Sequence, residues 1–142
     1  MKNTIEHLSA RVAPFFEGNH DILCVYLFGS HVRGTAHRDS DVDLAILFSD
    51  NVDPMEYTDR SLDLMRSITA LVATETDIIV LNRASTYVKF HVVQKGIKLF
   101  DRRDALNRRF EGRAMVEYYD YLPIRTRMED ALIRKIKERA HG

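Results

Sequence analysis

The sequence VYLFGSHVRGTAHRDSDVDLAIL, residues 25–47, decides the fold and is the most informative part of the chain. An apolar run from Ile22 to Phe28 predicts a first strand, which ends at Gly29-Ser30. A polar connector follows, and a second apolar run predicts a strand from about Val42 to Phe48.

Two aspartates, Asp41 and Asp43, stand at positions i and i+2 of the second run, so their side chains are expected on the same face. Two carboxylates this close repel each other, which predicts a cation between them. A divalent metal is the natural candidate, and carboxylate, phosphate and water ligands suit magnesium. The stretch therefore predicts phosphate chemistry that depends on a metal.

The pair Gly29-Ser30 follows the first strand, and a short helix is expected after it, through Arg33. Glycine lets a ligand approach the backbone, and the free N–H groups of a helix N-terminus point at an anion. Ser30 adds a hydroxyl donor, and Arg33 adds a charge that can fork onto phosphate oxygens. Taken alone, Gly-Ser after a strand is a weak signal, because many ordinary turns contain it.

A third strand is predicted from Thr76 to Leu81, with Asp77 near its start. A charged residue there is either a surface strand end or a ligand at the edge of the sheet. In isolation the surface interpretation is favoured. The presence of Asp41 and Asp43 on another strand reverses that preference.

Helices and one short strand complete the predicted core. Pro14 is expected to end or kink the first helix, and Asp53, Ser85 and Gly96 supply caps, with Gly96 as a C′ glycine. The predicted elements are a helix from Asn3 to Phe16, a helix beginning at Asp53-Pro54, a helix from Ser85 through Gln94 and a strand from Ile97 to Phe100.

Beyond Asp101 the pattern is helical, with apolar residues recurring every four positions on two stripes. Pro123 predicts a kink or a break between the stripes. So small a sheet cannot cover these faces fully, which predicts that a partner or a second copy covers part of them. The stripes are Leu106, Phe110, Ala114, Tyr118 and Leu122, then Ile124, Met128, Leu132 and Ile136.

The 142 residues are 45% apolar and 30% charged, which indicates a single globular domain, residues 1–142, with a core at about 20–100 and C-terminal helices at about 102–140. We expect neither a signal peptide nor a membrane span, and a single cysteine, Cys24, favours the cytoplasm. Cys24 lies in an apolar run and is expected in the core. The net charge is zero, which disfavours non-specific duplex binding.

The spacing from Gly29-Ser30 to Asp41 and Asp43 is GS-x10-DxD, and it resembles the nucleotidyltransferase superfamily that includes DNA polymerase beta and aminoglycoside nucleotidyltransferases. The closer resemblance is to the minimal nucleotidyltransferase (MNT) group, whose small members are often antitoxins of HEPN-domain ribonuclease toxins. It covers about residues 22–100. It implies an α/β (α+β) fold, a small mixed sheet flanked by helices, with a helical C-terminal extension.

The resemblance also implies roles for the motif residues. Gly29 and Ser30 would hold the β- and γ-phosphates of ATP, with Arg33 as a further nucleotide-binding residue. Asp41 and Asp43 would bind two Mg²⁺ ions. Asp77 would help to hold the catalytic metal and would take the proton from the incoming hydroxyl.

One position departs from the family's pattern. Relatives often read Gly-Ser-Arg-x-Arg-Gly, and here His31 replaces the first basic residue. His31 can still donate to a phosphate, but its charge depends on pH, unlike that of the arginine it replaces.

The leading hypothesis is an antitoxin that transfers AMP from ATP to a tyrosine of a cognate HEPN toxin. The toxin would be held as a stable hetero-oligomer through the C-terminal helices, and neither a membrane nor direct nucleic-acid binding is expected. One alternative is an antitoxin that neutralises by binding without catalysis. A further alternative is a nucleotidyltransferase for an aminoglycoside-like small molecule, although such relatives usually carry an additional helical domain.

Overall fold

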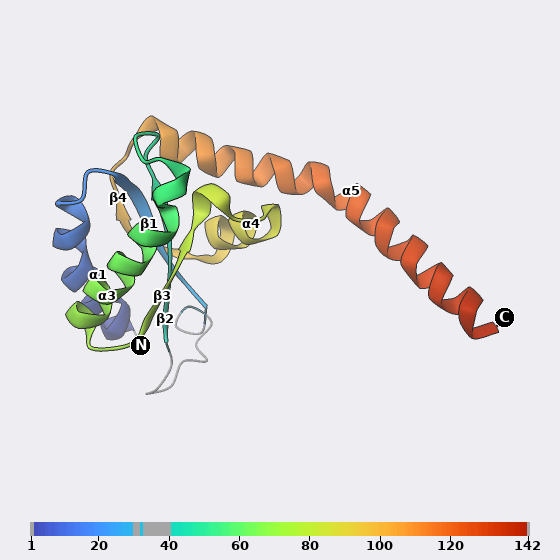
Figure 1. The fold of residues 1–142 in the computed structure, drawn as a ribbon, viewed down its shortest axis with the longest axis horizontal. Helices are drawn as coiled ribbons and strands as arrows, with labels where there is room; N and C mark the ends of the chain where they lie inside the picture. Colours follow the sequence, from blue (N-terminus) through green and yellow to red (C-terminus); the bar gives the residue numbers. More distant parts are fainter. Residues whose placement is uncertain (1, 30–31, 33–40, 142) are drawn as a thin grey trace.

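A four-stranded mixed sheet forms the centre of the protein, for which a computed structural model describes residues 2–29, 32 and 41–141 (Figure 1). The strand order is β3-β2-β1-β4, in which β2 and β3 are parallel while β1 is antiparallel to β2 and to β4. The bounds are Ile22–Phe28 for β1, Val42–Phe48 for β2, Thr76–Val80 for β3 and Ile97–Asp101 for β4. The predicted mixed sheet is confirmed.

Helices cover both faces of the sheet (Figure 1). Helices α1 (Lys2–Glu17) and α3 (Tyr57–Val72) lie on one face, and α4 (Thr86–Lys95) with the first turns of α5 (Ala105–His141) lies on the other. Two short 3₁₀ turns, η1 (Pro54–Glu56) and η2 (Leu81–Arg83), precede α3 and α4.

The alternation of side chains along β2 divides the core into two layers. Val42, Leu44, Ile46 and Phe48 belong to the cluster that also contains the apolar side chains of α1 and α3. Ala45 and Leu47 belong to the cluster that contains those of α4 and α5. Successive residues of a strand point to opposite faces of the sheet, and helices cover both faces here. Both sets of side chains are therefore buried, which accounts for the near-continuous apolar run of β2.

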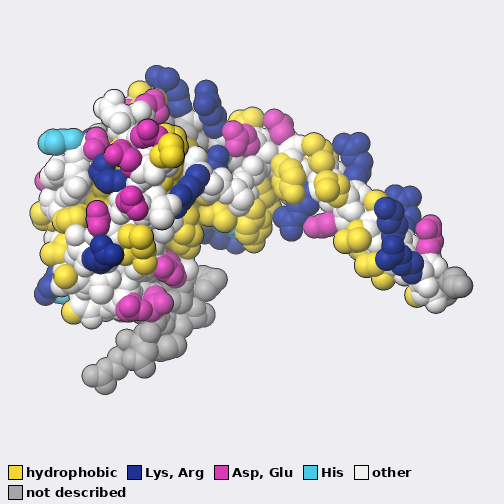
Figure 2. Space-filling view, viewed as in Figure 1, with side chains coloured by type: hydrophobic (Ala, Val, Ile, Leu, Met, Phe, Trp, Pro, Cys, Tyr) yellow, Lys and Arg dark blue, Asp and Glu magenta, His cyan; other side chains and the backbone are white. Residues whose placement is uncertain are grey.

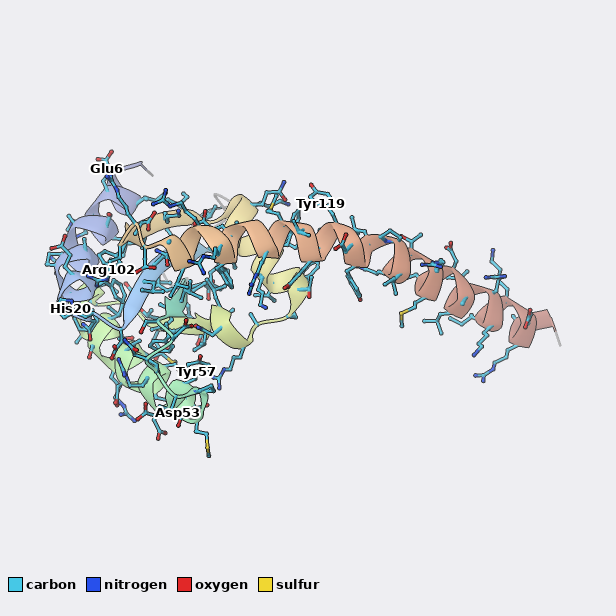
Figure 3. All side chains as sticks on the ribbon, turned by 90° about the horizontal axis from the view of Figure 1, so that it is seen from above. Glu6, His20, Asp53, Tyr57, Arg102 and Tyr119 are labelled. Atoms are coloured by element: carbon cyan, nitrogen blue, oxygen red, sulfur yellow. The ribbon has the colours of Figure 1, made fainter. Side chains whose placement is uncertain are left out.

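Ser85 caps α4 as predicted, accepting from the Val88 N–H (3.2 Å), whereas Asp53 caps the 3₁₀ turn η1 that leads into α3 rather than α3 itself. The prediction for Gly96 is wrong in its backbone conformation. The Asp53 carboxylate accepts a hydrogen bond from the Met55 N–H (3.0 Å), and Figure 3 shows Asp53 and Tyr57 together at the start of α3. Gly96 has φ −70° and ψ 158°, which is extended rather than left-handed. Glycine is needed there because a Cβ atom would run into the carbonyl oxygen of Val92.

Both internal prolines lie within continuous helices. Pro14 is inside α1, which reaches Glu17, and Pro123 is inside α5. The C-terminal region is therefore one helix of 37 residues rather than two, and of the two outcomes predicted at Pro123 the break does not occur. The second half of α5 changes direction slightly and projects from the body (Figure 1). In the part of the chain described, no helix is long and apolar enough to cross a membrane.

A polar cluster fixes the start of α5 to the sheet. The hydroxyl of Tyr26 on β1 donates to Glu111 of α5 (2.5 Å), and Glu111 also pairs with Lys98 of β4 (2.6 Å). Burial and this hydrogen bond raise the pKa of Tyr26 far above its usual range, so the phenol stays neutral. Cys24 beside it is buried, and burial raises the pKa of its thiol to about 12. The prediction of a core cysteine rather than a reactive thiol is confirmed.

Arg102 joins the end of β4 to the turn between α1 and β1, and its removal is expected to lower stability. Its guanidinium donates to the carbonyl oxygens of Phe16 (2.8 Å), Asn19 (3.1 Å) and Ile22 (3.0 Å). Arg102→Ala should lower the free energy of unfolding by about 2–4 kcal/mol, because it leaves these part-buried carbonyls without their charged donor. Urea unfolding of the wild type and the variant measures this difference in unfolding free energy.

The matched control is Arg108→Ala, because Arg108 is exposed on α5 and should change stability by less than about 0.5 kcal/mol. Equal effects of the two substitutions would show that Arg102 does not hold this turn.

Candidate active site

The parallel pairing of β2 and β3 places two of the predicted site residues side by side. Asp43 of β2 is directly opposite Asp77 of β3 in the register. Paired residues on neighbouring strands lie on the same face, with the strands roughly 4.8 Å apart. Asp43 is half-buried and Asp77 is exposed, so the two carboxylates lie at the solvent-facing end of the sheet. The position of Asp77 opposite Asp43 is consistent with the prediction that Asp77 belongs to the site rather than to an ordinary surface strand end.

Gly29 lies against Asp43 from the other side. The antiparallel pairing of β1 with β2 puts Phe28 opposite Asp43, and Gly29 follows with φ +80°, in the left-handed region. A Cβ atom at Gly29 would overlap the Asp43 carboxylate, 3.0 Å from its Cγ. The residue therefore has to be glycine for two independent reasons, its backbone angle and the room that the carboxylate occupies.

The sequence motif predicted a ligand-facing role for Gly29 but missed its contact with Asp43. The signal was available, because a hairpin-like pairing of the first two strands places the residue after the first strand beside the start of the second. Gly29 thus leaves room for the Asp43 carboxylate as well as turning the chain.

Asp41 lies just before β2 and is exposed. Within the described residues, no three side chains from His, Cys, Asp or Glu form a group that could hold a metal ion. The strand register therefore places Asp43 beside Asp77, whereas Asp41 is the residue immediately before β2. The two adjacent carboxylates fit a hard cation such as magnesium, which takes oxygen ligands and usually retains several waters.

Where the short helix was predicted, Val32 is helical and its N–H donates to the carbonyl oxygen of Gly29 (3.1 Å). Ser30, His31 and Arg33 lie outside the described residues. What the structure shows of the predicted site is the end of β1, Gly29 and the two carboxylates of β2 and β3.

Comparison with known proteins agrees with this arrangement. The family model of the polymerase beta nucleotidyltransferases matches residues 11–105, which include β1, β2, β3 and β4. The chain belongs to this family. Its pattern thus spans Gly29, Asp43 and Asp77, the residues that the strand register brings together.

One relative within this family is similar to the chain in sequence. Over 76 residues the chain is 34% identical to the protein adenylyltransferase MntA of Shewanella oneidensis. The aligned segment covers 54% of this chain and 52% of that protein. The chain thus aligns with about half the length of this curated relative.

Two solved structures share the fold. One is a toxin-antitoxin crystal structure with AMP-PNP, in which the matched chain is 26% identical with a TM-score of 0.65, over 80% of this chain and 87% of that one. The other is a tri-AMPylated S. oneidensis HEPN toxin in complex with MNT antitoxin, 20% identical with a TM-score of 0.68, over 91% and 98%. The second likeness concerns the fold alone.

Gly29→Ala is expected to cost about 2–4 kcal/mol of unfolding free energy, from the left-handed backbone and the collision with Asp43. In an Asp43→Ala background the same substitution should cost at least about 1 kcal/mol less, because the colliding carboxylate is gone. A double-mutant cycle by chemical denaturation measures the difference.

Gly112→Ala is the matched control, because Gly112 lies within α5 with open space around its Cα. It should stabilise the protein by about 0.5–1 kcal/mol. A Gly29→Ala cost that is the same with and without the Asp43 carboxylate would refute the contact between them.

Proposed function

We propose that this protein is an antitoxin that transfers AMP from ATP to a tyrosine of a HEPN-family toxin and thereby neutralises it. The observation that carries the proposal is the adjacent pair Asp43 and Asp77 beside Gly29. Support comes from the 34% identical protein adenylyltransferase and from the 26% identical chain of a toxin-antitoxin structure with AMP-PNP.

In this reaction the tyrosine oxygen attacks the α-phosphorus of ATP, and the bond from that phosphorus to the bridging oxygen of the β-phosphate breaks. The tyrosine becomes an AMP ester and pyrophosphate leaves. We assign to Asp77 the acceptance of the hydroxyl proton, because it is the more exposed of the two paired carboxylates. Gly29 and Ser30 are proposed to hold the β- and γ-phosphates, with Arg33 nearby.

Asp43, Asp77 and Asp41 are proposed to hold two Mg²⁺ ions. Bound magnesium would neutralise phosphate charge and steady the attacking and leaving oxygens. The chain's own contribution is to keep two carboxylates adjacent by strand register and to orient one of them against a residue without a side chain.

The projecting half of α5 is the proposed toxin-binding surface. Its apolar side chains are spaced by three or four residues and form one stripe, flanked by Lys and Arg. Figure 2 shows hydrophobic side chains along one edge of this helix and basic ones along the other, and in Figure 3 its side chains point into open space. The exposed stripe consists of Tyr121, Ile124, Met128, Leu132 and Ile136.

This exposed stripe also favours the second candidate function, an antitoxin that neutralises by binding alone. The stripe accounts for a partner but not for the paired carboxylates, which a purely binding protein would not need. A cytoplasmic location is part of the proposal.

The test is to incubate the chain and its HEPN partner with ATP and magnesium and to weigh the partner by mass spectrometry. Wild type should add AMP to the partner. Asp43→Asn and Asp77→Asn should each slow transfer by about 10³-fold or more, because the first removes a proposed magnesium ligand and the second removes the proposed acceptor of the hydroxyl proton. Asp63→Asn on α3, whose carboxylate is exposed and pairs with the exposed Arg66, is the control and should leave transfer unchanged.

Loss of transfer without loss of the complex would assign the carboxylates to catalysis. If wild type forms the complex but adds no mass, or if the Asp43→Asn chain neutralises the toxin as well as wild type does, neutralisation is by binding.

A further inference from the structure

A concave site lies at the end of the sheet opposite to Asp43. A cavity of about 420 Å³ opens between α4, the first turns of α5, and the sheet. Leu23 at the start of β1 and Leu47 at the end of β2 line it, whereas Asp43 stands at the beginning of β2. The cavity is thus separated from the candidate active site by the length of a strand.

The wall of the cavity is apolar below and cationic at the rim. Leu23, Leu47, Leu106 and Phe110 supply apolar surface. The Asn82 side chain also reaches the wall, but its amide is engaged with the backbone of Phe48, accepting from the N–H (2.8 Å) and donating to the carbonyl (2.9 Å). Polar recognition therefore falls to the charged side chains of the rim.

Three cationic and two acidic side chains line the rim. Lys89 of α4 faces Glu117 of α5 at 4.0 Å, which offsets one charge of each sign. Arg109 and Arg113 stand four positions apart on α5, and neither forms an ion pair within the described residues. The remaining carboxylate is that of Asp50, so the rim keeps a net positive charge.

We propose that this cavity binds a small organic phosphate, with the phosphate between Arg109 and Arg113 and the body of the ligand on the apolar wall. Residues four apart on a helix are neighbours on its surface, and guanidinium groups match phosphate oxygens in forked geometry. The volume lies in the range of small-molecule sites. This inference does not depend on the proposed function, because none of its residues belongs to the candidate active site.

The test is an NMR titration of the 142-residue chain with AMP, with inorganic phosphate and with adenosine, following assigned backbone amides. AMP should shift the signals of Leu23, Phe110 and Ala114, which line the cavity, apart from any shift at Gly29. AMP should bind there more tightly than phosphate, which lacks the apolar body, and more tightly than adenosine, which lacks the charge.

Arg109→Ala combined with Arg113→Ala should weaken AMP binding at these amides by about tenfold or more, through the loss of charged hydrogen bonds. Arg109→Lys with Arg113→Lys, which keeps the charge, should weaken it less. The control pair Arg108→Ala with Arg134→Ala removes two exposed arginines of α5 outside the cavity and should leave binding unchanged. AMP shifts confined to Gly29 and its neighbours, equal binding of phosphate and AMP, or equal binding by the double-alanine variant and the control pair would overturn the proposal.

Discussion

The parallel register that sets Asp43 opposite Asp77 is the constraint on which the candidate site depends. Like charges directly opposite each other on neighbouring strands are destabilising, and the proposed magnesium would offset this repulsion. On the other flank of Asp43, the antiparallel pairing of β1 with β2 requires a residue without a side chain, and Gly29 meets this need with a left-handed backbone. Asp43 is thus constrained from both sides, by Asp77 on β3 and by Gly29 after β1.

The site and the exposed apolar surface belong to different elements. The carboxylates lie at one end of β2 and β3, while the apolar stripe lies on the projecting half of α5. The start of α5 is fixed to β1 and β4 by Tyr26, Glu111 and Lys98. Because this anchor is independent of the carboxylates, substitutions at the site and on the stripe can separate chemistry from binding.

Local patterns predicted most of the fold, because strands and caps are specified by short-range sequence. The bounds of β1 and β2 agree with the apolar runs, and Ser85 caps α4 as expected, whereas Asp53 caps the 3₁₀ turn before α3. The prediction at Gly96 was wrong because a close approach of backbone atoms, not the helix end itself, excludes a side chain there. The contact of Gly29 with Asp43 and the anchor of Glu111 arise from tertiary packing, which periodicity does not contain. The roles of Ser30 and Arg33 stay predictions.

The central claim is that Asp43 and Asp77 together form a metal-nucleotide site. Electron paramagnetic resonance of Mn²⁺, used in place of Mg²⁺, measures this directly by counting the ions bound in the presence of AMP-PNP. The account predicts saturable Mn²⁺ binding that is lost in both Asp43→Ala and Asp77→Ala while the Asp63→Ala protein binds as wild type. Equal Mn²⁺ binding by all four proteins would contradict it.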